Sequence, residues 1–434
     1  MYRNAPIHPL LRFFYLICRI LTWFGVHVFY RKRRVLGREN LKFDGPAIIV
    51  VNHPSTLLDV LNPCLHITQE PFFLANYGMF KHPVMNWILT RFFCIPVKRR
   101  EDVAVGEDRN NDAAFKKSFQ HLEKNGLLFI AAEGVSWMER WVRPFKAGAA
   151  RISLGAEARQ NWSLGVKILP VGLSYSAPDK FRSDVIVNFG KPIQVAEWKS
   201  KYSHDRNDAI NDLTLNIQQE VKSLVLDIHQ HENHDFIEQL EEIWRDKFPT
   251  DKNEYFRFRK SLIEQNFDNQ LLKEEVGKYK ELLDSHGLND MGLYAATQSK
   301  SLFSEVFLLI LGFPFFLIGY TFWVIPCQLI YRLTRKLDLY IGYDATIKIL
   351  AGLIFFPLYM AGIWQLANWW LGNSGYAWLV LAGFILSGFF VEFYQNNWFR
   401  RIQRMAAMSL KDQKPEMFNQ LLNLRSNIMD MTSI

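Results

Sequence analysis

The stretch "IIVVNHPSTLLDVLNP", residues 48–63, decides which fold this chain can adopt. Its four leading apolar residues are typical of a short strand that is buried on both faces of a sheet. A turn follows at 52–54, and a helix is expected after Pro54, because proline suits a first helical turn and Ser55 and Thr56 suit a helix N-terminus. The histidine in this turn is therefore expected at the carboxyl edge of a strand, where open α/β sheets bind their ligands.

Similar apolar runs recur along residues 35–200. They lie at 127–132, 166–175 and 184–193, and helix-length segments at 108–124 and 147–160 separate some of them. This alternation predicts an α/β sheet with helices on its faces. Residues 201–300 differ, because 206–228 and 235–248 place apolar residues three and four positions apart among charges. That spacing predicts a region of amphipathic helices.

Residues 1–34 form a separate segment that is expected to associate with a membrane. The apolar stretch at 9–30 is interrupted by Arg12 and Arg19, which fall on one face of a helix. This favours a helix that lies in the membrane interface over one that crosses the bilayer. The basic run at 31–34 would then meet anionic head groups. The alternative is a buried helix followed by a solvated run of charges.

Residues 301–434 contain three hydrophobic segments and a polar tail. The segments lie at 306–331, 349–371 and 376–394, and the first two carry no charge. Because a helix of about 20 residues crosses a bilayer, the first two are long enough to span it and the third needs its flanks.

The charges beside these segments predict their orientation. The loop at 372–375 is uncharged, whereas basic residues precede the second segment and follow the third, so these two segments form a hairpin with both ends in the cytoplasm. The first segment, interrupted by Gly312, Pro314 and Pro326, is expected to enter the membrane and return without crossing. The protein is therefore expected to be a membrane protein, multi-pass or hairpin-anchored, with residues 35–200 facing the cytoplasm.

Charge and cysteine usage limit the classes of partner. The formal net charge of +8 permits binding to anionic lipid, a phosphorylated substrate or nucleic acid. No nucleic-acid recognition signature is present, and the basic residues lie beside apolar segments, so no nucleic-acid partner is expected. The four cysteines are widely spaced and show neither metal-ligand spacing nor a disulfide framework, so neither a metal site nor a disulfide is predicted.

His53 and Asp59 are the first candidates for catalysis. From the helix or the turn before it, the Asp59 carboxylate could accept a hydrogen bond from one ring nitrogen of His53. The other nitrogen would be left as a base, and such an arrangement fixes the tautomer and raises the basicity of the imidazole. The alternative is a structural pair at the end of a buried strand.

A second stretch, "CIPVKRRED" at 94–102, collects positive charge. A short apolar run brings Lys98, Arg99 and Arg100 together at its end, and such a cluster suits hydrogen bonds to phosphate oxygens. A solvated surface turn is the alternative.

A third stretch, 127–151, ends a buried strand at Glu133-Gly134 and continues through Ser136, Arg143 and Lys146 to a helix start. Glycine lets the backbone approach a ligand closely, and the helix start offers unpaired N–H groups to an anion. A charged glutamate beside an apolar strand needs a partner, which makes an inert role less expected.

Together these blocks resemble the glycerolipid acyltransferase family, the glycerol-3-phosphate and 1-acylglycerol-3-phosphate acyltransferases. The family pattern is a histidine and an aspartate, then a basic residue after a strand, then Glu-Gly, then a proline in an apolar run. The matching positions are His53 and Asp59, Arg99 or its neighbours, Glu133-Gly134, and Pro170. The chain is similar to the branch with an "NHP" first block and a C-terminal hydrophobic hairpin, and the resemblance implies a mixed sheet flanked by helices.

The chain departs from the commonest pattern of this family at two positions. Five residues instead of four separate His53 from Asp59, which would rotate the carboxylate by about 100° if both lay in one helix. A turn before the helix can absorb the extra residue. Ser136 stands where many relatives carry arginine, and Arg143 or Lys146 is expected to supply that charge.

The resemblance implies acyl transfer from a thioester of coenzyme A or acyl carrier protein to a hydroxyl of glycerol 3-phosphate or 1-acylglycerol 3-phosphate, in phospholipid biosynthesis. His53 would act as general base and Asp59 would hold its imidazolium. The basic side chains Lys98, Arg99, Arg100, Arg143 and Lys146 would bind the phosphate, and Glu133, Gly134 and Ser136 would shape the acceptor site. No cofactor or metal is implied. The alternatives are another lysolipid acceptor, or an inactive membrane-anchored scaffold with a degenerate domain.

Overall fold

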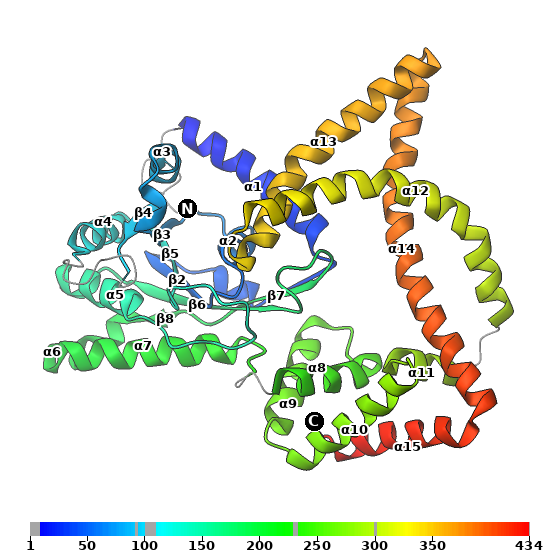
Figure 1. Cartoon of the computed structure of the whole chain (residues 1–434). Helices are drawn as coiled ribbons and strands as arrows, with labels where there is room; N and C mark the ends of the chain where they lie inside the picture. Colours follow the sequence, from blue (N-terminus) through cyan, green and yellow to red (C-terminus); the bar gives the residue numbers. More distant parts are fainter. Residues whose placement is uncertain (1–8, 92–93, 100–109, 229–232, 299–301, 434) are drawn as a thin grey trace. The chain divides into compact units, whose positions relative to one another are not determined.

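A computed structural model describes residues 9–91, 94–99, 110–228, 233–298 and 302–433 (Figure 1). Contacts divide the chain into two units. The first contains the chain up to residue 229 together with Leu339–Ile349 and is called the acyltransferase unit below, after the family that its sequence resembles. The second, the helical unit, contains 230–338 and 350–434.

An eight-stranded sheet forms the centre of the acyltransferase unit. Its strands are β1 (Lys32–Leu36), β2 (Ala47–Val51), β3 (Phe72–Asn76), β4 (Cys94–Val97), β5 (Leu127–Ala131), β6 (Lys167–Tyr175), β7 (Asp184–Phe189) and β8 (Ile193–Gln194). They are ordered β1-β7-β6-β2-β5-β3-β4, with β8 beside β6. β7 and β8 pair antiparallel to β6, and the other neighbours pair in parallel. The predicted mixed α/β sheet flanked by helices is therefore present.

The basic run at 31–34 lies at the edge of this sheet, where the sequence pattern predicted no strand. Lys32–Leu36 pairs in parallel with β7, and Arg31 and Arg34 lie 3.2 and 3.7 Å from the Asp184 carboxylate. An edge strand tolerates charged side chains because one of its sides meets solvent. Two of the arginines that were expected to meet lipid head groups therefore face an acid of the neighbouring strand.

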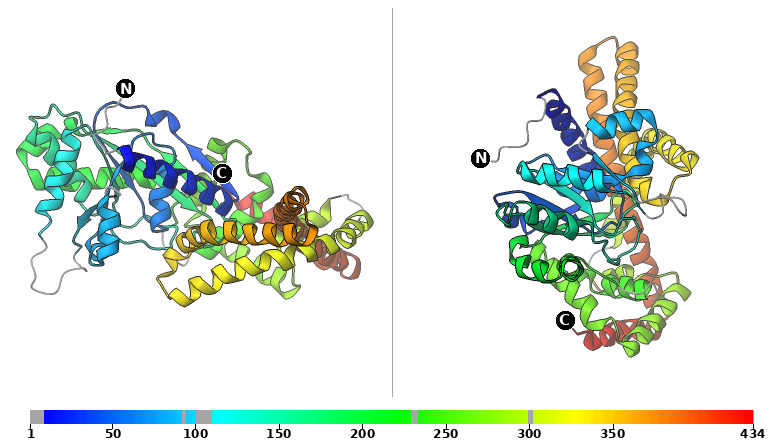
Figure 2. Two further views of the ribbon diagram at one scale, coloured as in Figure 1. Left: turned by 90° about the horizontal axis from the view of Figure 1, so that it is seen from above. Right: turned by 90° about the vertical axis from the view of Figure 1, so that its left-hand side faces the viewer.

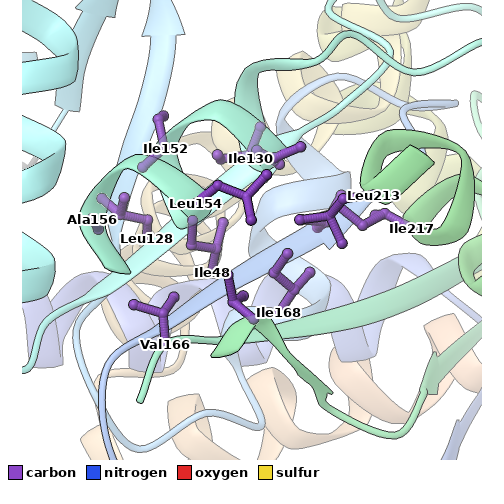
Figure 3. Packing of buried hydrophobic residues seen from close by; sticks show 14 of the residues in the cluster. Ile48, Leu128, Ile130, Ile152, Leu154, Ala156, Val166, Ile168, Leu213 and Ile217 are labelled. Atoms are coloured by element: carbon purple, nitrogen blue, oxygen red, sulfur yellow. The ribbon is translucent and has the colours of Figure 1, made fainter. Parts of the chain in front are cut away.

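The main core lies between the sheet and three helices, α4 (Asp112–Glu123), α5 (Gly148–Arg159) and α7 (Arg206–Ser223). Figure 3 shows how Ile48 of β2 and Ile168 of β6 pack with Leu154 of α5 and Ile217 of α7. Burying such a side chain stabilises the fold by about 1.5–3 kcal/mol. This packing fixes the carboxyl ends of β2 and β5, where the candidate site lies.

Further helices complete the acyltransferase unit. They are α1 (Pro9–Phe29), α2 (Leu57–Cys64), α3 (Pro83–Arg91) and α6 (Lys199–His204). Near the start of α1 the apolar side chains are exposed, Leu10, Phe13 and Phe14 among them, whereas Val26 and Phe29 at its end are buried. The end of α1 therefore packs into the protein, and its first turns present apolar surface outward.

The helical unit joins the helices after residue 233 to the C-terminal end of the chain. Its shorter helices are α8 (His234–Ile243), α9 (Lys252–Asn266), α10 (Gln270–Ser285), α11 (Asp290–Thr297) and α15 (Pro415–Met431). The buried Asp290 accepts hydrogen bonds from Arg425 Nε at 2.8 Å and from the Tyr279 hydroxyl at 2.8 Å. This contact links the last helix of the chain to α10 and α11.

Three long helices follow, α12 (Leu302–Leu337), α13 (Asp344–Leu371) and α14 (Ser374–Gln413). Together with α1, they are long and apolar enough to cross a membrane. α13 and α14 run side by side as a hairpin (Figure 2), with the rings of Trp364 and Trp378 5.6 Å apart. The sequence therefore predicted these apolar helices correctly.

The predicted interruption of the first of these segments is absent. α12 continues through Pro314 and Pro326 as one helix, and its axis is curved in Figure 1. A proline removes one backbone hydrogen bond and bends a helix, but the turns on either side can remain helical. Gly312 is needed for packing instead, because a Cβ there would lie 2.8 Å from the ring of Tyr394 in α14.

Candidate active site

The site begins where β2 ends. β2 is completely buried, and its ladder continues past Val51 through the Asn52 side chain. The Asn52 amide donates to Leu173 O at 2.9 Å and accepts from Leu173 N at 2.8 Å. These two bonds hold the start of the turn against β6, so the position of the following residue, His53, is fixed by the sheet.

His53 and Asp59 are in contact despite the extra residue between them. His53 Nδ1 lies 2.9 Å from Asp59 Oδ2, which also accepts from Ser55 N at 2.6 Å. The helix begins later than the sequence predicts: α2 starts at Leu57, after Thr56 adopts φ 45° and ψ −116°. This left-handed turn absorbs the additional residue, so the carboxylate in the first turn of α2 points back toward the imidazole.

Asp59 lies in a buried polar environment. Its side chain is 0% exposed, and burial raises the pKa of its carboxyl, while the hydrogen bond from His53 lowers it. Behind it lie two other fully buried groups, Asn62 and the Tyr175 hydroxyl, joined at 3.3 Å. Burial and the nearby Asp59 carboxylate raise the pKa of Tyr175. Asp59 thus faces the cavity only through His53.

Glu133 supports the histidine from the end of β5. Its Oε1 accepts from the backbone N–H of His53 at 3.2 Å, and burial raises the pKa of this glutamate to about 8. The side chain is not among those that line the cavity described below. Gly134, which does line it, has φ +79°, a conformation that L side chains rarely adopt. Glu133 therefore holds the turn that carries His53, and Gly134 forms part of the cavity wall.

His53 opens onto a cavity of about 1130 Å³ in the acyltransferase unit. Much of its wall is apolar, including Val60 and Leu61 of α2, Phe73 of β3 and Phe115 of α4. Lys98, Arg99 and Lys146, three of the predicted phosphate-binding residues, also line it. The wall can therefore contact both an apolar chain and an anion.

The structure separates the other predicted site residues. Ser136 lines the cavity and its hydroxyl accepts from Thr56 N at 3.0 Å. Arg143 is not among the lining residues: it donates to Glu139 at 2.8 Å, and its guanidinium lies 4.1 Å from the ring centre of Trp137. Arg100 lies outside the described residues.

Many of the lining residues were not predicted from the sequence, and three of them bear on the chemistry of the cavity. Arg151 reaches the cavity from the first turn of α5, one turn beyond Lys146, so helical periodicity after the Gly148 start could have identified it. Tyr340 and Tyr343 belong to the segment between α12 and α13. No local pattern indicates these tyrosines, because they lie nearly 300 positions after His53.

The arrangement suits proton transfer. Because Nδ1 of His53 is bound to Asp59, Nε2 is the ring nitrogen left to accept a proton from a hydroxyl in the cavity. Within the described ranges, no group of three or more His, Cys, Asp or Glu side chains could hold a metal ion.

Comparison with known proteins gives matches to part of the chain. The family model described as Acyltransferase matches residues 32–174. The chain is 29% identical over 144 residues to glycerol-3-phosphate O-acyltransferase 1 of Saccharomyces cerevisiae, covering 32% of this chain and 19% of that protein. It is 27% identical over 163 residues to a chloroplastic 1-acyl-sn-glycerol-3-phosphate acyltransferase of Brassica napus, covering 37% and 42%.

These matches span less than half the length of either relative. Among solved structures, the chain is similar to the 1-acyl-sn-glycerophosphate acyltransferase of Thermotoga maritima, with 18% identity, a TM-score of 0.34, and coverage of 48% of this chain and 80% of that one. The residues that the family model matches include the His53–Asp59 turn and Glu133-Gly134. The segment 32–174 is therefore similar to the family described as Acyltransferase.

Proposed function

We propose that this protein is an O-acyltransferase that transfers a fatty acyl group from a thioester to a hydroxyl of glycerol 3-phosphate or 1-acylglycerol 3-phosphate. The observation that carries the proposal is the 2.9 Å contact between His53 Nδ1 and the buried Asp59, at the edge of a cavity that is partly apolar and partly cationic. Both relatives named above act on glycerol 3-phosphate or its 1-acyl derivative, according to their names.

His53 would act as the general base. Its Nε2 takes the proton of the acceptor hydroxyl while the oxygen attacks the thioester carbonyl carbon. The carbon–sulfur bond then breaks, and the imidazolium returns the proton to the leaving thiolate. The products are an ester and a free thiol, of coenzyme A or acyl carrier protein. Asp59 stabilises the imidazolium between the two steps and fixes the tautomer.

Four cationic side chains of the cavity would bind the acceptor phosphate. Lys98 and Arg99 follow β4, and Lys146 and Arg151 lie around the start of α5. Arginine forms paired hydrogen bonds with phosphate oxygens, and the helix start adds backbone N–H groups. Arg143 is left out of this set because it does not line the cavity.

The apolar helices would place this site on a membrane. The acyl chain and the product are apolar, so an enzyme resting on the bilayer avoids moving the chain through water. We place the acyltransferase unit on the cytoplasmic face, because arginines and lysines flank the α13–α14 hairpin and the loop between its helices has none.

The end of α12 leads into a segment, Leu339–Ile349, that packs within the acyltransferase unit. This supports placing that end of α12 and the start of the hairpin on the cytoplasmic face. The loop at 372–375 would then lie on the opposite face. A cysteine at Ser374, with the native cysteines replaced, should be labelled by an impermeant reagent from the opposite face alone.

The function is tested with the full-length protein in lipid vesicles. Acyl coenzyme A or acyl carrier protein is supplied with glycerol 3-phosphate, 1-acylglycerol 3-phosphate or an uncharged lysolipid, and release of free thiol and of acylated product is measured. We expect thiol release that depends on a phosphorylated acceptor. Thiol release with the other lysolipid alone would assign a different acceptor, and no release with any acceptor would favour an inactive scaffold.

The phosphate assignment is tested on α5. Arg151→Gln should raise the KM for the phosphorylated acceptor by about tenfold with little change in kcat, because a lost charge-assisted hydrogen bond costs about 1.5 kcal/mol. Arg159→Gln is the matched control, since Arg159 lies on the same helix and pairs with Glu123 away from the cavity. Equal effects of the two substitutions would remove Arg151 from the site.

A further inference from the structure

A short segment that follows α12 and includes the first turns of α13 belongs to the acyltransferase unit, although the rest of both helices does not. Leu339–Ile349 is separated from the rest of that unit by more than 100 residues, yet its contacts are with it. Lys348 Nζ donates to Asp179 O at 2.7 Å and lies 3.7 Å from Asp344. Asp344, Ala345 and Thr346 are buried. The segment is therefore packed in place and is not a loose connection.

This segment contacts the turn that carries His53. The Thr56 hydroxyl donates to Gly342 O at 2.9 Å, across 286 positions of sequence. The approach is close, because a Cβ on Gly342 would lie 3.1 Å from Thr56 Cγ2 and 2.6 Å from the Tyr340 ring. A side chain at this position would displace the Tyr340 ring or Thr56.

Thr56 adopts a strained backbone conformation, and the hydrogen bond to Gly342 helps to stabilise it. A β-branched residue at φ 45° is rare, and such a conformation costs about 1–3 kcal/mol. Its backbone N–H is held by Ser136 Oγ and its hydroxyl by Gly342 O. Thr56 is also the residue whose turn lets Asp59 reach His53. The segment thus supports the geometry of the catalytic pair from outside the matched domain, which ends at 174.

The same segment supplies part of the cavity wall. The rings of Tyr340 and Tyr343 line the cavity together with the apolar side chains Leu57, Val60 and Leu61 of α2. A tyrosine offers a large apolar ring with one polar end, which suits a surface between a lipid chain and water. The cationic lining residues come from other elements: Arg19 from α1, Lys98 and Arg99 from the residues after β4, and Lys146 and Arg151 from around the start of α5.

We propose that Tyr340 and Tyr343 form the part of the cavity wall that contacts the acyl chain of the substrate, and that they determine which chain lengths the enzyme accepts. The chain then lies between α2 and the segment 339–349, while the phosphate lies at the cationic side chains. The proposal rests on the function proposed above. It also couples the site to the membrane, because α13 begins inside the segment.

The test uses the full-length protein in vesicles and a series of acyl thioesters of increasing chain length. Tyr343→Ala and Tyr340→Ala should change the ratio of kcat/KM between the longest and shortest chains by about fivefold, the effect of losing one aromatic contact. The KM for glycerol 3-phosphate should not change. Tyr343→Phe keeps the ring and should restore the original preference. Tyr331→Ala on α12 is the matched control, because Tyr331 is exposed and outside the cavity.

The support of the turn is tested separately. Thr56→Val removes the hydroxyl that binds Gly342 and keeps the branched shape, whereas Thr56→Ser keeps the hydroxyl. We expect Thr56→Val to lower kcat for every chain length and Thr56→Ser to retain it. Equal loss in both variants would contradict a role for the Gly342 contact.

A binding measurement keeps the proposal independent of turnover. The dissociation constant of a non-reactive thioether analogue of long-chain acyl coenzyme A is measured by calorimetry. Tyr343→Ala should weaken it about fivefold and Tyr331→Ala should not. If the wild-type protein transfers no acyl group but Tyr343→Ala still weakens binding of the analogue, the proposed function is wrong and the proposed role of the tyrosines in binding the acyl chain is supported. If all variants bind alike or keep the same chain preference, the proposal is wrong.

Discussion

Each unit of the molecule buries an aspartate beside a tyrosine, but the two aspartates have different partners. In the acyltransferase unit, Asp59 is bound by His53 at 2.9 Å and lies near Tyr175. In the helical unit, Asp290 is bound by Arg425 and by the Tyr279 hydroxyl, each at 2.8 Å. Burial raises the pKa of both carboxyl groups, so the pKa alone does not distinguish them.

The difference lies in the partner and in access to a cavity. An arginine stays charged at every accessible pH, so the Asp290–Arg425 pair is not suited to proton transfer. Its role is to join α11 to α15. A histidine ring has two nitrogens, and His53 binds Asp59 through one of them while it lines the cavity. A buried carboxylate thus joins helices in one unit, and in the other it holds the imidazole that we propose to accept a proton.

The largest expected effect comes from removing the base. His53→Ala should lower kcat by about 10⁴-fold, or about 5 kcal/mol of transition-state stabilisation, and Asp59→Asn by about 10²-fold, because the imidazole then loses its anionic partner. His82→Ala is the matched control, since His82 is exposed and outside the cavity. The assay is thiol release, and activity retained in His53→Ala would exclude the proposed mechanism.

A smaller effect is expected from the matched pair in the helical unit. Arg425→Ala leaves the buried Asp290 without its cation and should destabilise that unit by about 3 kcal/mol. Hydrogen exchange should show faster exchange in α10, α11 and α15 and no change in α5. Arg257→Ala, at an exposed position of α9, should cost less than about 0.5 kcal/mol. Faster exchange in both units would contradict this division.

The smallest effect concerns the acid that supports His53. The folded protein holds the proton of Glu133 up to about pH 8, whereas the unfolded chain releases it near the ordinary value of 4.5. The folded state therefore binds more protons between these values, and stability falls as pH rises through this window. Glu133→Gln stays neutral and keeps the oxygen that binds His53 N. Its Tm should rise relative to that of the wild type between pH 6 and 8, by roughly 2–4 °C for each kcal/mol. A Tm difference between Glu133→Gln and the wild type that does not change with pH would contradict a raised pKa of Glu133.

The local sequence predicted what local patterns encode. The all-apolar run at 47–51 specified a strand buried on both faces, and three-and-four spacing specified the helices after 206. Local signals misplaced two features. The helix after Pro54 starts at Leu57, because the Thr56 turn takes a left-handed conformation that propensities do not favour, and the basic run at 31–34 joins the sheet because β7 offers it an edge.

The sequence by itself determined the strands, the apolar helices and the candidate site residues, His53, Asp59, Lys98 and Arg99, because these depend on periodicity and on residue type. Only the tertiary structure decided which of them meet. In the folded protein Arg143 donates a hydrogen bond to Glu139, and Arg151 lines the cavity. It also placed Gly342 against Thr56 from 286 positions away. Such contacts depend on packing between distant segments, and no local pattern of the chain records them.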